Sequence, residues 1–268
     1  MKLAILSDIH EGLNRKNTKA DIMGILKKWI TAHLPDVFIT NGDIAVGPEK
    51  SLALLNQLQN EFPQTKVLFV HGNHDIYHEN SNFAYETLLT FPGNLGNGPV
   101  ELGENWVLIG DGGWYDYTFG LEEYTKEQFS LGQYNDFTWP DKNYAHWPGP
   151  DQKETERYLT QLEQWLRNYH DKNIIMVTHV VPFSHFVLCK GDPSWDFFNA
   201  MMGSSHFGEL AIKYGVKKYI FGHVHSRFHE QYKGIEMICN PLGYYPHEWD
   251  CKSAEEEIPL RIKVIEIE

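Results

Sequence analysis

The sequence is poor in cysteine and has neither a long apolar run nor a long block of like charges. Its three cysteines cannot all pair with one another and form no C-x-x-C pair, so we interpret them as reduced thiols of a cytoplasmic protein. The chain opens with only four consecutive apolar residues, Leu3 to Leu6, which is too short for a signal-peptide core. No apolar run approaches the length of a membrane span, so we expect no membrane contact.

Basic residues are also in short supply, with 23 against 36 acidic ones and a formal net charge of −13. A body this negative repels a nucleic-acid backbone unless a local basic stripe overrides the total. Arg15, Lys16 and Lys19 are too few for such a stripe, and we interpret them as a solvated face. The 42% apolar and 22% charged content of the 268 residues is that of an ordinary globular chain. We therefore expect a small-molecule substrate and no nucleic-acid partner.

Apolar runs alternate with helical patterns along the chain. Strands are predicted at 3–6, 37–40 and 67–70, separated by a helix from about Thr18, with Asp21 completing its capping box, to Pro35 and by a helix over 48–62. This β-α-β-α-β order predicts a parallel sheet with helices on its faces, an α/β fold. Further strands are predicted at 106–109, 174–177, 219–221, 227–232, 235–238 and 261–267, and a helix at 154–169. We expect a single domain, 1–268, with an aromatic-rich insertion at about 112–150 and a loop insertion at about 180–207.

Five of the predicted strands end in carboxylate, amide or imidazole side chains. Because ligands gather at the carboxyl ends of strands in open α/β sheets, we expect these side chains to converge. They are Asp8, His10, Asp43, Asn73, His74, His179, His223 and His225. Oxygen and imidazole donors without thiolate suit manganese, iron, zinc, nickel or cobalt rather than calcium. Without His74, seven donors are too many for one tetrahedral ion but suit two ions that share a carboxylate, and Asp43 is the natural bridge.

These residues resemble the calcineurin-like metallophosphoesterases. The five ordered blocks of that family are present as Asp8-Ile9-His10, Gly42-Asp43, Gly72-Asn73-His74-Asp75, His179 and Gly222-His223-Val224-His225. The resemblance implies a four-layer α/β/β/α sandwich with a dinuclear site, for which we favour manganese or iron. It places the first ion on Asp8, His10, Asp43 and His225, and the second on Asp43, Asn73, His179 and His223. It also implies that His74 faces the substrate and that Asp75 lies behind His74 and fixes its tautomer.

The same resemblance implies hydrolysis of a small phosphomonoester or phosphodiester by a metal-bridging hydroxide, with His74 as general acid. The site keeps a net charge near +1, because the charge of two divalent ions exceeds that of Asp8, Asp43 and the hydroxide together. The acidic body therefore does not exclude a phosphate substrate. The chain departs from protein Ser/Thr phosphatases, because Ile44-Ala45-Val46-Gly47 follows Asp43 where they have a D-R-G-like segment. Val46 also replaces the tyrosine ligand of purple acid phosphatases, so a stand-alone bacterial-type phosphoesterase fits best.

Two alternatives and one pocket hypothesis accompany this interpretation. A nuclease is one alternative, because DNA-processing members share the first and last blocks, and a non-catalytic scaffold of the same fold is the other. The aromatic insertion carries eleven aromatic residues from Trp114 to Trp147. We expect Trp114 and Tyr115, just after a strand, to line the substrate pocket with Asn73 and His74 and to stack on a nucleobase or aryl group.

Overall fold

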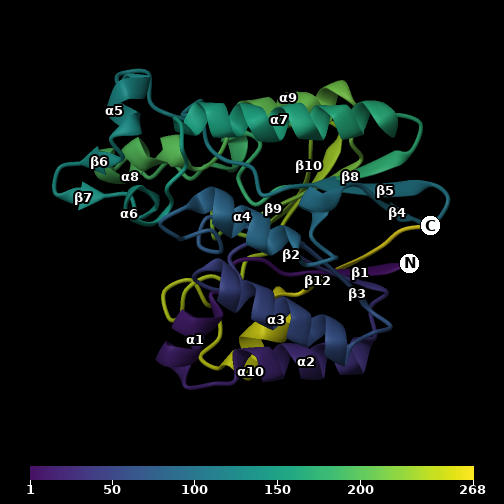
Figure 1. The fold of residues 1–268 in the computed structure, drawn as a ribbon. Helices are drawn as coiled ribbons and strands as arrows, with labels where there is room; N and C mark the ends of the chain where they lie inside the picture. The colour runs from purple at the N-terminus through teal and green to yellow at the C-terminus, as the bar shows by residue number, and fades with distance from the viewer.

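Short apolar runs form the strands of two sheets in the computed structural model, which describes residues 1–268 (Figure 1). The first sheet has the order β12 (Lys263–Glu266), β1 (Lys2–Ile5), β2 (Val37–Asn41), β3 (Lys66–Val70). The second has the order β10 (Phe228–Tyr232), β11 (Ile235–Cys239), β9 (Lys218–Phe221), β8 (Asn173–Val177), β5 (Trp106–Gly110), β4 (Val100–Leu102). The strands β1, β2 and β3 are parallel, as are β11, β9, β8 and β5, and antiparallel strands close the remaining edges.

Helices cover the outer face of each sheet, which gives the four layers α/β/β/α (Figure 1). The first sheet carries α1 (Glu11–Thr18), α2 (Ile22–His33), α3 (Pro48–Glu61) and α10 (Ala254–Arg261), with α4 (Ser81–Leu89) beside α3. The second sheet carries α7 (Asp151–Asn168) and α9 (Ser205–Lys213). The two insertions supply the short elements α5 (Lys126–Ser130), β6 (Gln133–Tyr134), β7 (Phe137–Thr138), α6 (Asp141–Tyr144) and α8 (Pro193–Phe197), which lie together at one end of the sandwich.

The central strands of both sheets (β1, β2, β3, β5, β8 and β9) are buried on both faces, which explains why they are continuous apolar runs in the sequence. Successive side chains of β1 alternate: Leu3 and Ile5 belong to the core between the two sheets, whereas Ala4 packs in the core under the helices. On the opposite sheet Ile175 and Val177 of β8 complete the inter-sheet core. This rigid double layer fixes the strand ends from which the polar loops emerge.

The predicted start of the first helix, at about Thr18, is wrong. The chain forms two helices there, and α2 begins at Ile22, with the Asp21 side chain accepting a hydrogen bond from the Gly24 amide at 3.0 Å. Thr18 instead ends α1 and bonds back to the Asn14 carbonyl. None of the helices combines the length and apolar composition needed to cross a bilayer.

Candidate metal centre

The loops that follow β1, β2, β3, β8 and β9 carry the predicted ligands, and they meet at one end of the sandwich. Five of these ligands have left-handed backbone conformations, with positive φ angles that non-glycine residues rarely adopt: Asp8 at 51°, His10 at 43°, Asp43 at 56°, His223 at 67° and His225 at 52°. Such strained positions persist where the surrounding structure holds them, and they cluster at functional sites. The backbone therefore turns sharply after each strand to bring the side chains together.

Two glycines of the sequence blocks are required by close approach. A Cβ on Gly42 would lie 2.3 Å from Nδ1 of His179, and a Cβ on Gly72 would lie 2.1 Å from Oδ1 of Asp43. Both distances are far below contact range, so only glycine lets the second and third loops lie against these side chains.

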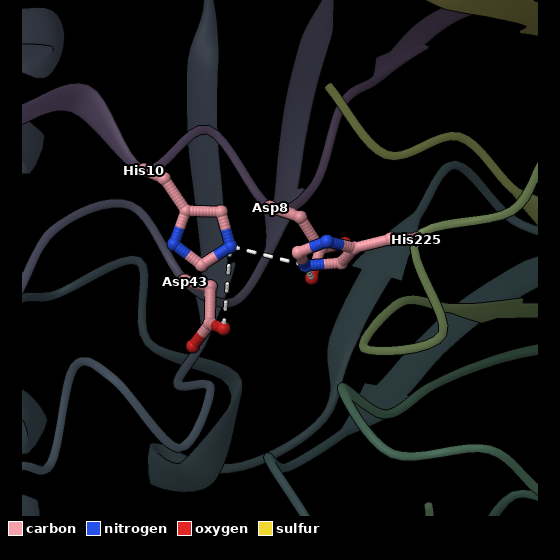
Figure 2. Close-up of side chains that lie close together, drawn as sticks. All are labelled: Asp8, His10, Asp43 and His225. Carbon is pink, nitrogen blue, oxygen red and sulfur yellow. Dashed lines mark hydrogen bonds and ion pairs between the residues drawn. The ribbon is translucent and has the colours of Figure 1, made fainter. Parts of the chain in front are cut away.

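The first group of ligands forms a compact cluster, which Figure 2 shows with its side chains pointing toward one another. One ligand atom from each of Asp8, His10, Asp43 and His225 lies within 4.8 Å of the others. The Nε2 atoms of His10 and His225 are 3.1 Å apart, and Nε2 of His225 is 3.3 Å from Oδ1 of Asp8. Nε2 of His10 lies 3.7 Å from Oδ2 of Asp43. Two carboxylates and two imidazoles that converge in this way could hold a metal ion.

Asp43 connects this cluster to a second group. Its Oδ2 lies 3.6 Å from Nε2 of His179, which in turn is 3.1 Å from Oδ1 of Asn73. The ring of His223 packs edge-on against the ring of His179, with 5.1 Å between centroids. All four side chains are buried or nearly so. The structure thus brings all seven predicted ligands together, with the carboxylate of Asp43 between the two groups.

Hydrogen bonds fix which nitrogen of each imidazole is free. Nδ1 of His179 donates to the Asn41 carbonyl at 2.9 Å, and Nδ1 of His225 donates to Glu248 at 2.7 Å. Nε2 of His223 donates to the Met201 carbonyl at 3.1 Å. Because a neutral imidazole has one donor and one acceptor nitrogen, the remaining nitrogen of His179 and of His223 has its lone pair available for a metal, and that of His225 becomes available once its ring loses a proton.

Burial and neighbouring charges shift the pKa values of the ionisable groups at the site. Burial lowers the pKa of His10 well below its usual range and that of His179 to about 3, so both rings are neutral donors. Burial also raises the pKa of Asp43 well above its usual value. Burial opposes the charge of His225 as well, but Asp8 and Glu248 outweigh it and raise its pKa to about 10. His225 is therefore protonated in the protein alone, and a divalent ion would take the place of the proton on its Nε2.

His74 lies at the surface of the site, whereas Asp75 does not contact its ring. Nε2 of His74 is 3.9 Å from Oδ2 of Asp43 and 3.4 Å from the Tyr244 hydroxyl. The prediction that Asp75 fixes the His74 tautomer is wrong in this structure. The Asp75 carboxylate is fully occupied by backbone amides of Asp43, Ile44, Ala45 and Gly72 and by the Ser51 hydroxyl. It therefore anchors the second and third loops to each other.

Trp114 and Tyr115 are likewise not where we expected them. Both side chains are only 1% exposed, and they stack on each other 4.7 Å apart in the core. Nε1 of Trp114 donates to Asp151 at the start of α7 at 2.8 Å. Neither ring lines the cavity beside the metal centre, because both are buried in the core. The insertion residues that do line it lie further along the chain and include Phe137, Trp139 and Trp195, and Tyr77 and Tyr244 line it from outside the insertions.

Asp141 is a site residue that the sequence analysis did not identify. Its Oδ1 accepts hydrogen bonds from Nδ2 of Asn73 at 2.8 Å and from the Tyr77 hydroxyl at 2.6 Å. Its Oδ2 accepts one from Nε1 of Trp139 at 2.9 Å. By holding Nδ2, Asp141 turns the amide oxygen of Asn73 toward His179. No sequence block marks it; a W-P-D segment between aromatic residues was its only signal.

A family model described as calcineurin-like phosphoesterase matches residues 1–227. Among solved structures, the fold is similar to that of a phosphopantetheinyl hydrolase from Mycobacterium tuberculosis, with a TM-score of 0.74, 17% identity and coverage of 98% of this chain and 95% of that one. A Thermus thermophilus protein gives a TM-score of 0.55 with 12% identity and coverage of 98% and 97%. A dimetal phosphatase from Danio rerio gives 0.50 with 15% identity and coverage of 89% and 86%. No curated protein matches the sequence.

Proposed function

We propose that this chain hydrolyses small phosphoesters at a site for two metal ions. The premise is that the chain belongs to the calcineurin-like phosphoesterase family and is a metal-dependent phosphoesterase. The observation that carries this proposal is the position of the Asp43 carboxylate. Its Oδ2 lies 3.7 Å from Nε2 of His10 on one side and 3.6 Å from Nε2 of His179 on the other. A carboxylate with an imidazole donor on either side fits a bridge between two ions.

We assign the ligands as the resemblance to the family implies, with one ion on Asp8, His10, Asp43 and His225 and the other on Asp43, Asn73, His179 and His223. The donor set of carboxylates, imidazoles and one amide fits manganese or iron. When bound, such ions neutralise phosphate charge and lower the pKa of water. The protein contributes neutral imidazoles at His10 and His179, a fixed tautomer at His223 and an oriented Asn73 amide, so these donors need little rearrangement.

His74 is the residue that we assign to the leaving oxygen. Its side chain is 21% exposed, and its ring borders the cavity beside Asp43. In the protein alone, burial lowers the pKa of His74 to about 4, so the ring is neutral near pH 7. The negative charge of a bound phosphoester raises that pKa, so the proton would be held at His74 only in the substrate complex. Hydrolysis adds water across one P–O bond, and the departing alcohol takes the proton from His74.

A panel of purified variants tests this function. The wild type, Asp43→Asn and His74→Asn are loaded with Mn²⁺, their bound metal is quantified, and turnover of p-nitrophenyl phosphate and bis(p-nitrophenyl) phosphate is measured. The wild type is expected to bind two ions. Asp43→Asn is expected to lose at least one ion, whereas His74→Asn is expected to retain both and to lose about 10²- to 10⁴-fold in kcat. A phosphopantetheinyl diester serves as a further substrate, because the Mycobacterium tuberculosis hydrolase has a similar fold.

Asp171→Asn, at an exposed carboxylate remote from the site, is the matched control and should behave as wild type. Two bound ions without turnover of any ester would favour a non-catalytic scaffold. Absence of metal binding by the wild type would overturn the proposal. Preferential cleavage of DNA or RNA, lost at high salt, would instead support a nuclease.

A further inference from the structure

Two pockets of different character meet at the metal centre. The first, which we call the apolar pocket, is a cavity of about 300 Å³ lined by residues of both insertions together with Asp43 and Asn73. The second, which we call the basic pocket, is a cavity of about 480 Å³ between α1 and the loop that precedes α3. His74 and Tyr244 line both pockets, so their rings stand between the two. The insertion elements α6 and α8 lie apart from α1 at this end of the sandwich (Figure 1).

The walls of the apolar pocket fit an uncharged group. Phe137 and Trp195 remain 52% and 44% exposed at its edge, which is unusual for such large apolar side chains. Trp139 is held in place by stacking on Phe198, with 5.5 Å between centroids. No lysine or arginine lines this pocket. Lys190 is nearby in sequence, but its ammonium group lies over the Trp195 ring at 3.2 Å.

The two carboxylates outside the ligand set that line the apolar pocket are already hydrogen-bonded. Asp141 accepts from Asn73, Tyr77 and Trp139, and Glu248 accepts from His225 and from the Tyr244 amide. They add negative charge without offering free groups to a ligand. Away from the metal centre, an anionic substituent would meet two carboxylates and no lysine or arginine, so this pocket disfavours a second phosphate or a carboxylate.

The basic pocket has the opposite charge. Arg15, Lys16 and Lys50 line it, with Glu11 as the only acidic residue. Glu11 pairs with Arg15 at 3.1 Å, which leaves Lys16 and Lys50 without a carboxylate partner. Both lysines are exposed. This local excess of positive charge stands out on a chain whose formal net charge is −13.

We propose that the substrate is an asymmetric phosphodiester, with an uncharged, apolar-faced alcohol in the apolar pocket and an alcohol bearing an anionic group in the basic pocket. The proposal rests on the proposed function, since it places the scissile phosphate at the metal centre where the pockets meet. Two pockets that share His74 and Tyr244 leave room for a substituent on either side of one phosphorus atom, which a monoester would not use. Hydrolysis then adds one water, breaks one ester P–O bond and yields one alcohol and one phosphomonoester.

Two p-nitrophenyl diesters test the basic pocket. One carries butanol as the second alcohol, and the other carries 4-hydroxybutanoate, which differs by a carboxylate. The wild type with Mn²⁺ is expected to favour the carboxylate diester about 3- to 10-fold in kcat/KM, the range that two exposed ion pairs can supply. In Lys16→Glu/Lys50→Glu this ratio is expected to fall to about one or below, and added salt should lower the wild-type ratio. Lys28→Glu/Lys153→Glu, at two exposed lysines outside both pockets, is the charge-matched control.

Aromatic variants test the apolar pocket with the same substrates. Phe137→Ala and Trp195→Ala are expected to raise KM for the carboxylate diester about 5-fold or more while changing kcat little, because these rings contact the p-nitrophenyl group and no reacting atom. Phe83→Ala, an equally exposed ring outside both pockets, is the control. Because all the substituted side chains are exposed, the variants should fold, and melting curves check this.

Different outcomes would refute the asymmetric substrate and the proposed function on which it rests. If the metal-loaded wild type cleaves neither diester nor bis(p-nitrophenyl) phosphate, the proposed function fails. If it cleaves both diesters with equal kcat/KM, and neither the lysine nor the aromatic variants change the kinetics, the phosphoesterase function stands and the asymmetric substrate is refuted. Preference for p-nitrophenyl phosphate over both diesters would also refute it.

Discussion

Single residues determine how the metal-binding side chains are oriented, and Asp141 is the clearest case. It lies on the aromatic insertion, far in sequence from every ligand, yet it holds Nδ2 of Asn73 at 2.8 Å. An amide side chain has an oxygen and a nitrogen of nearly equal size, so without this contact the Asn73 amide could present either one to a cation. Only the oxygen can bind a metal. A carboxylate remote from the sequence blocks therefore decides which atom of Asn73 would face the second ion that we propose.

Asp141→Asn should weaken binding of the second ion about 10- to 100-fold, the usual cost of removing a contact that orients a ligand. The asparagine replaces one acceptor oxygen with an amide donor, so Asn73, Tyr77 and Trp139 can no longer all be satisfied. Titration with Mn²⁺, monitored by calorimetry, checks this by resolving the two affinities. Asp171→Asn is the control, and two unchanged affinities in Asp141→Asn would show that the orientation of Asn73 does not depend on this contact.

Asp111 offers a test of pH dependence away from the ligands. It is fully buried at the end of β5, where it accepts hydrogen bonds from the Tyr85 hydroxyl and the Gly112 amide, both at 2.7 Å. Burial raises the pKa of Asp111 to about 6, above its value in an unfolded chain. The protonated form is thus favoured by folding, so this contribution to stability is present below about pH 4 and is lost as the pH rises through about 6.

The free energy of unfolding of the wild type, relative to Asp111→Asn, should therefore fall by about 1 kcal/mol between pH 5 and pH 7. Urea unfolding of both proteins at several pH values measures this difference, and the isosteric asparagine cancels the titration of all other groups. A difference that rises with pH, or stays constant, would mean that Asp111 is ionised more easily than its burial implies.

At the scale of the element, the sequence predicts the strands well and the insertions poorly. The runs at 37–40, 67–70 and 174–177 are strands because both of their faces are buried, and this leaves a continuous apolar signal. The ends of the strands could be located for the same reason. The seven ligands predicted to follow them therefore do converge in the structure. The helix α4 was not predicted, because its apolar residues follow no clear helical period. The path of the aromatic insertion depends on long-range contacts, such as Trp114 with Asp151, that no local pattern reveals.

The start of α7 anchors the aromatic insertion, and this leads to a prediction for Trp114. Asp151 accepts hydrogen bonds from Trp114, Tyr117 and Lys142, so one carboxylate connects the beginning of the insertion, its α6 helix and α7. Trp114→Phe removes the indole donor and leaves a small void. It should lower the free energy of unfolding by about 2–3 kcal/mol while leaving KM for aryl phosphodiesters unchanged. Urea unfolding and steady-state kinetics check both parts, and a selective rise in KM would restore Trp114 as a pocket residue.

At the scale of the whole molecule, the metal centre joins the two sheets. Asp8, His10 and Asp43 follow strands of the first sheet, whereas His179 and His223 follow strands of the second. The core between the sheets is apolar. At this end of the sandwich, by contrast, carboxylates and imidazoles take the place of hydrophobic contacts. Ions bound to both sets of loops would hold the two halves together, and such ions bind the folded state alone because the unfolded chain has no assembled site.

Removal of the metals should therefore lower Tm. At a free metal concentration about 1,000 times Kd, each ion contributes about 4 kcal/mol by binding to the folded state, so chelation of both ions corresponds to a fall of roughly 15 °C for a chain of this size. Scanning calorimetry with and without EDTA measures the shift, and excess Mn²⁺ should reverse it. Asp43→Asn provides the control: lacking the shared carboxylate, it should respond less to EDTA than the wild type. A wild-type Tm that is unaffected by demonstrated loss of both ions would show that the two sheets are held together without the metal centre.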